Sequence, residues 1–204
     1  MQIGLDRQIL ETLDYDRALK RIRNDLQSDF IYAPHLAAVF HTAGDTLRTR
    51  LDTKLRSGTF EPRLPISLEL PKASGFTPIR SILWPLERLS YQLVVDAIAP
   101  VAEDTLDRDR VYSYVLLEED PMGFMFEPSG ECYSAFRTRL LELCQDDNFS
   151  HVVAADVASF FESLYQHVLV NLLDSAGCES RLVNFLEKLL FAFTQKDSYG
   201  IVQG

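Results

Sequence analysis

The chain has 204 residues, of which 47% are hydrophobic and 25% are charged. This length and composition allow one domain, or one and part of a second, with a sizeable core, and they exclude a disordered or fibrous protein. The net charge of −10 excludes a uniformly basic nucleic-acid-binding surface. Residues 1–100 hold 13 Lys and Arg against 12 Asp and Glu, and residues 101–204 hold 7 against 18, so a local basic groove is still allowed in the first half.

The cysteine spacing and the N-terminal residues indicate the cellular compartment of the protein. Cys132, Cys144 and Cys178 fit neither a zinc site nor a disulfide framework, which favours a reduced, cytoplasmic protein. The N-terminus carries Asp6 and Arg7 and lacks the apolar core of a signal peptide. No apolar run approaches the ~18 residues of a membrane span, so we expect no membrane partner.

Two helices are predicted at the N-terminus. Apolar residues at helical spacing predict a helix over residues 6–27 and a second over 34–56, which Gly44 is expected to kink or split. The pattern changes near residue 60, so an N-terminal helical region over 1–58 is expected to precede a domain over 59–204.

Strands and helices alternate in the second region. Residues 64–72 and 78–83 predict a hairpin, and residues 111–117 and the compact apolar run 152–157 predict strands, the latter buried. Helices are expected over residues 84–105, 131–144, 165–173 and 181–193, the second with Tyr133, Phe136, Leu140, Leu141 and Leu143 available for burial. We expect an α+β fold.

Asp156 ends the predicted strand at 152–157 and is followed by Phe160 and Phe161. A carboxylate at the end of a buried strand needs a partner, which is usually a metal ion, a base or a helix N-terminus. The plainer interpretation is that Asp156 caps the next turn and that both phenylalanines belong to the core.

The segment strongly resembles the first catalytic motif of reverse transcriptases. The resemblance implies that Asp156 and the main-chain carbonyl of Val157 bind Mg²⁺ or Mn²⁺, and that Phe161 lies beneath the incoming sugar and screens for its 2′-hydroxyl. Two-metal phosphoryl transfer requires carboxylates of this kind. Glu162 stands where family members often have Asp.

The predicted hairpin carries two cations, Lys72 and Arg80. A three-residue loop at 74–76 would pair Leu70 with Arg80 and place both cations on one face, where they could clamp a triphosphate. The plainer interpretation is an exposed hairpin with two solvated cations. The segment resembles the fingers hairpin of reverse transcriptases, in which Lys72 and Arg80 match the triphosphate-binding positions.

Residues 200–204 resemble the Gly-x-Pro-Gln-Gly motif of the same family, with Val202 in place of proline. The resemblance implies that Gln203 contacts the nucleotide and Gly204 the template or primer. The matches run in the family's order over about residues 62–204. They imply right-hand polymerase fingers and a partial palm, preceded by the N-terminal helices, with the Tyr-x-Asp-Asp motif expected after Gly204.

The function that the resemblance implies is RNA-directed DNA polymerisation of the bacterial type, as in retrons, group II introns and phage-defence systems. Its partners would be an RNA template, a DNA or RNA primer and deoxynucleoside triphosphates, with an associated non-coding RNA as a further candidate. A 204-residue chain without the Tyr-x-Asp-Asp motif is expected to be inactive alone. The alternatives are a template-independent polymerase of the abortive-infection type and a non-catalytic nucleic-acid-binding remnant.

Overall fold

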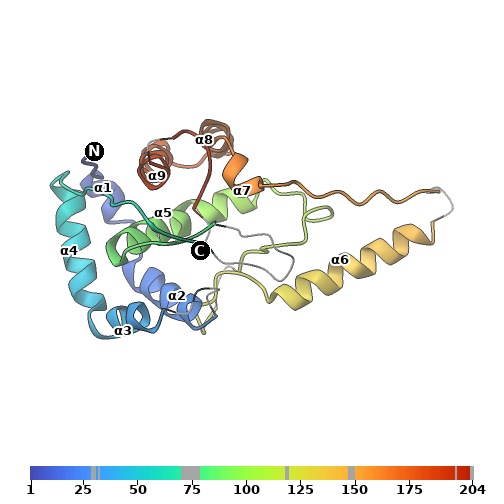
Figure 1. The fold of residues 1–204 in the computed structure, drawn as a ribbon, viewed down its shortest axis with the longest axis horizontal. Coiled ribbons are helices and arrows are strands. Elements are labelled where there is room, and N and C mark those ends of the chain that lie inside the picture. The colour runs from blue at the N-terminus through green and yellow to red at the C-terminus, as the bar shows by residue number, and fades with distance from the viewer. Residues whose placement is uncertain are drawn as a thin grey trace.

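The structure is a computed structural model that describes residues 1–28, 31, 33–69, 79–117, 120–146, 150–195 and 197–202. It is a helix-rich α+β fold (Figure 1). The helices are α1 (Arg7–Leu10), α2 (Tyr15–Ser28), α3 (Pro34–Thr42), α4 (Gly44–Arg56), α5 (Pro85–Glu103), α6 (Ser129–Cys144), α7 (Phe160–Ser163), α8 (Gln166–Ser175) and α9 (Ser180–Phe193). Two strands, β1 (Ile66–Glu69) and β2 (Ile79–Ile82), pair antiparallel.

Both predicted N-terminal helices are divided. The first is interrupted between α1 and α2, where the Asp14 carboxylate accepts a hydrogen bond from the main-chain N–H of Arg17 at 2.9 Å and so caps α2. The second breaks before Gly44, as the sequence indicated. A Cβ at buried Gly44 would lie 2.6 Å from Nη2 of Arg23, at the flexible end of that side chain, so a small shift of Arg23 would accommodate it.

The core is formed where α2, α3, α4 and α9 pack around α5 (Figure 1). Leu51 and Leu55 of α4 and Leu89 and Leu93 of α5 are fully buried and belong to one cluster. The buried core is therefore continuous across residue 58, and the division of the chain at that point stays a prediction. None of the helices in the described part of the chain has the length and hydropathy that a membrane crossing requires.

A buried ion pair joins α2 to α5. Nη1 of Arg21 lies 2.6 Å from Oδ1 of Asp96, and Nε2 of Gln92 donates to the same oxygen at 2.7 Å. Burial raises the pKa of the Asp96 carboxyl above its ordinary value, although the hydrogen bonds from Arg21 and Gln92 act in the opposite direction. Desolvation thus outweighs the attraction of the partner charge, which is common for buried ion pairs.

The predicted hairpin is confirmed, but its predicted register is wrong. Arg80 lies opposite Leu68 rather than Leu70, and Ile66 lies opposite Ile82. The shift is two positions, so Arg80 keeps the same face of the hairpin as Leu68, because side chains alternate along a strand with a period of two.

The strand predicted at residues 111–117 does not form. Arg108 donates from Nη1 to the carbonyls of Val111 and Ser113, at 3.0 and 3.1 Å, and from Nη2 to the carbonyl of Tyr114 at 3.2 Å. These carbonyls are taken up by a side chain, so they do not enter a ladder, and the segment keeps one isolated bridge, from Leu116 to Phe126.

The buried strand predicted at residues 152–157 is also wrong. The helix before it, α6, forms as expected but has no buried residue, and it projects away from the helical body (Figure 1). Residues 150–158 return from its tip as an extended, exposed segment, in which Val153 is 89% exposed. Within the described residues no neighbouring segment shares a ladder with it, and an extended chain without such a neighbour is neither a strand nor buried.

Candidate functional site

The structure brings together two segments that the sequence separates widely: residues 161–166, which follow Asp156, and residues 198–202. The main-chain N–H of Ile201 donates to the carbonyl of Phe161 at 2.9 Å, and that of Gly200 donates to the carbonyl of Leu164 at 2.8 Å. Tyr165 and Tyr199 form an antiparallel bridge, and their ring centroids lie 4.9 Å apart. We call this contact the motif junction.

Buried Gln166 connects the two segments of the motif junction through hydrogen bonds. Its side chain is only 2% exposed, and Nε2 donates to the carbonyl of Gly200 at 2.7 Å and to Oγ1 of Thr194 at 3.0 Å. Its main-chain N–H donates to the carbonyl of Ser198 at 2.9 Å. Gln166 belongs to none of the motifs that the sequence indicates. The available signal was a glutamine one turn before Val170, on the face of α8 that is buried.

Gly200 occupies a backbone conformation that other residues rarely adopt, with φ at +86°. A Cβ there would stand 3.4 Å from the carbonyl oxygen of Glu162, which is ordinary contact, so the dihedral angle rather than the space requires glycine. The glycine of the predicted 200–204 motif therefore has a structural reason for its position.

Phe161 lies at the motif junction through its main chain. It is half-buried on the short helix α7, with its ring centroid 5.4 Å from that of Phe160 in an edge-to-face arrangement. The preceding Ser159 has φ at +50°, which turns the chain sharply from the extended segment into α7. The backbone of Phe161 is thus fixed on one side by this turn and on the other by Ile201.

Asp156 and Val157 lie on the extended segment before that turn. Both residues are exposed, and the exposed fraction of Val157 is 66%. Within the described residues, no group of three or more His, Cys, Asp or Glu side chains is arranged to hold a metal ion. The described part of the chain therefore does not by itself form the two-metal site that the resemblance implies, since one carboxylate holds two divalent ions poorly.

The remaining predicted residues are only partly covered by the structure. Arg80 is half-buried on β2, where it lies opposite Leu68. Lys72, Gln203 and Gly204 lie outside the described residues. The predicted clamp of Lys72 and Arg80 therefore stays a prediction.

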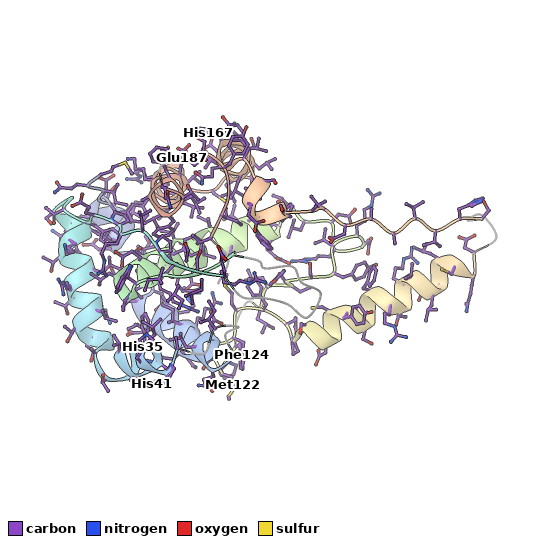
Figure 2. The ribbon with its side chains drawn as sticks, viewed as in Figure 1. His35, His41, Met122, Phe124, His167 and Glu187 are labelled. Carbon is purple, nitrogen blue, oxygen red and sulfur yellow. The ribbon has the colours of Figure 1, made fainter. Side chains whose placement is uncertain are left out.

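One histidine has an acidic partner. Nδ1 of His167 on α8 lies 2.6 Å from Oε1 of Glu187 on α9, and Figure 2 shows the two side chains together. His35 and His41 are exposed on α3. The contact links α8 to α9 beside the motif junction, since Tyr165 packs its ring 5.2 Å from that of His167.

The chain was compared with known protein families, curated proteins and solved structures. No family model, no curated protein and no solved structure matches the chain. The motifs and the geometry of the described residues therefore carry the functional argument.

Proposed function

We propose that this chain carries the fingers and the first part of the palm of an RNA-directed DNA polymerase. The observation that carries the proposal is the motif junction, where the N–H of Ile201 donates to the carbonyl of Phe161 at 2.9 Å. Two segments that resemble nucleotide-contacting motifs of one family would have to lie together in order to contact the same nucleotide. Their contact supports the resemblance independently of the residues that first indicated it.

The proposed roles follow the positions of the residues. Phe161 screens the sugar of the incoming nucleotide, because an aromatic ring excludes a hydroxyl by its volume without leaving a polar group unpaired. Gln203 is proposed to contact the nucleotide, and Gly204 the template or primer. Lys72 and Arg80 bind the triphosphate, which two neighbouring cations recognise well.

Asp156 is proposed as one carboxylate ligand of Mg²⁺ or Mn²⁺, with the Val157 carbonyl beside it. When bound, such ions supply the positive charge that stabilises the attacking and leaving oxygens of phosphoryl transfer. Further carboxylates would have to come from outside the described residues. The proposed partners are an RNA template, a DNA or RNA primer and deoxynucleoside triphosphates.

Primer extension by the complete protein tests the proposal. An RNA template, a DNA primer, deoxynucleoside triphosphates and Mg²⁺ should give templated DNA, and Asp156→Asn should abolish it without unfolding the protein. The matched control is Asp104→Asn, an exposed carboxylate just after α5, which should keep full activity. Full activity of Asp156→Asn would overturn the assignment, and extension that does not require a template would favour the template-independent polymerase instead.

A further inference from the structure

A large cavity lies away from the motif junction, where residues 110–114 and 126–127 meet the first half of α6. Its volume is about 920 Å³. Five aromatic side chains, which we call the aromatic cradle, line it: Tyr112, Tyr114, Phe126, Tyr133 and Phe136. Two pairs of rings meet edge to face, with centroids 5.3 Å apart for Tyr114 and Phe126 and 5.9 Å apart for Tyr112 and Phe136, and Tyr133 lies tilted against Phe136.

Tyr114 is held in a strained conformation that leaves its ring exposed. Its φ is +53°, in the left-handed region that is costly for a residue with a Cβ, and the residue is 68% exposed. The strained backbone therefore does not serve to bury the Tyr114 ring. Backbone strain that packing does not explain is typical of ligand-binding positions.

Arg108 maintains this conformation. It donates to the carbonyls of Val111, Ser113 and Tyr114, and its own guanidinium is held by the Glu103 carboxylate, with Nε 2.6 Å from Oε1 and a second contact between Nη2 and Oε2. The loop that carries Tyr112 and Tyr114 is thus shaped before any ligand arrives. A preorganised site loses less entropy on binding.

The charges of the lining select the kind of ligand. Among the described residues of the lining, one cation, Arg110, and one carboxylate, Glu127, balance each other. Arg110 also lies 3.2 Å from Asp107, which offsets its charge further. This balance does not favour a phosphate group, whereas an uncharged planar ring with donors and acceptors along its edge complements both the aromatic faces and the polar rim.

We propose that the aromatic cradle stacks a nucleobase of a single-stranded nucleic acid. Stacking on exposed aromatic rings is the general way in which proteins bind unpaired bases, and bases within a duplex have no free faces to offer. This site goes beyond the proposed polymerase function, because it requires neither Asp156 nor a metal ion.

The test uses the complete protein in EDTA, which excludes metal-dependent binding. The probe is a single-stranded oligodeoxynucleotide of about ten nucleotides that contains 2-aminopurine, whose fluorescence falls when the base stacks. The reference probe is an abasic strand of the same length and charge, measured by competition. We expect the base-containing strand to bind on the order of tenfold more tightly than the abasic strand, with quenching.

Two variants separate stacking from folding. Tyr114→Leu removes the ring, and Tyr114→Gly removes it while suiting the left-handed backbone, so the second variant keeps the fold. Both should lose the preference for the base-containing strand, whereas Tyr114→Phe and the control Leu172→Ala, at an exposed position of α8, should keep it. Equal affinity for both strands in the wild type, or an unchanged preference in Tyr114→Gly, would overturn the proposal. Adenosine monophosphate binding as tightly as the strand would overturn the assignment to a single strand.

Discussion

The main-chain N–H of Ile201 lies 2.9 Å from the carbonyl oxygen of Phe161, and it joins segments that are roughly forty positions apart in the chain. Neither group belongs to a helix ladder, so the contact is a tertiary one. It places the main chain of the residue predicted to screen the sugar beside the first residues of the segment predicted to contact the templating base pair.

Phe161 should control the choice of sugar in the complete protein. Replacing it with Ala or Val should increase the efficiency of ribonucleotide incorporation relative to deoxynucleotides on the order of tenfold, because the ring no longer excludes the 2′-hydroxyl. The measurement is the ratio of the two kcat/KM values. Phe124→Ala, an exposed phenylalanine in the loop before α6, is the control and should leave that ratio unchanged. A constant ratio in folded Phe161→Ala would assign Phe161 to the core.

Gln166 should stabilise the motif junction. Gln166→Leu should lower the free energy of unfolding by about 1–3 kcal/mol, because it leaves the carbonyl of Gly200 without its buried donor. Urea unfolding measures the loss. The exposed Gln8→Leu on α1 should change stability by less than about 0.5 kcal/mol. If the two variants were equally stable, the buried hydrogen bonds of Gln166 would contribute nothing.

Gly200 should resist substitution for a conformational reason. Gly200→Ala should lower the free energy of unfolding by about 1–2 kcal/mol, since φ at +86° is unfavourable for alanine. Gly130→Ala is the opposite case: it lies on α6, where an added Cβ meets nothing within 4 Å, and it should raise stability by up to about 1 kcal/mol. Thermal unfolding of the two variants should therefore shift in opposite directions, and a shared direction would contradict the argument.

Removing one partner of the buried pair of Arg21 and Asp96 should lower stability strongly, whereas replacing both partners with apolar residues should lower it little. Arg21→Met should lower the free energy of unfolding by about 3–5 kcal/mol, because it leaves a buried carboxylate without its cation. The double variant Arg21→Met/Asp96→Leu should recover most of that loss. Urea unfolding of the wild type, of Arg21→Met, of Asp96→Leu and of the double variant measures the coupling, and a loss in the double variant equal to the sum of the two single losses would contradict the argument.

The same pair predicts a pH dependence. Because the pKa of Asp96 is raised in the folded protein, the folded state keeps this proton at pH values where the unfolded chain has released it. The contribution of Asp96 to stability therefore falls as the pH rises from the ordinary carboxyl range through the folded pKa. Unfolding midpoints of the wild type and of the double variant are compared as the pH rises from the ordinary carboxyl range toward neutrality, and those of the wild type should fall more steeply. A slope equal to or shallower than that of the double variant would be the opposite result.

Local patterns in the sequence were enough to predict most of the helices. The apolar spacing that predicted residues 84–105 and 181–193 corresponds to α5 and α9, and the expected break at Gly44 separates α3 from α4. These features depend on the 3.6-residue period and on single residues with strong conformational preferences, so they can be read without knowledge of distant neighbours. The hairpin also followed from alternation, although its register did not, because several turn lengths fit the same alternation.

The tertiary structure alone decided which segments of the chain lie next to each other. The run at 152–157 has the composition of a buried strand, yet it is exposed because no described segment pairs with it. In the predicted strand at 111–117, the carbonyls of Val111, Ser113 and Tyr114 accept hydrogen bonds from Arg108 instead of from a neighbouring strand. The structural role of Gln166 depends on its hydrogen bond to the carbonyl of Gly200, and that contact exists only because the fold brings α8 beside Gly200. Periodicity records the preferences of a segment, whereas pairing and burial depend on a second segment, and that partner is determined by the fold as a whole.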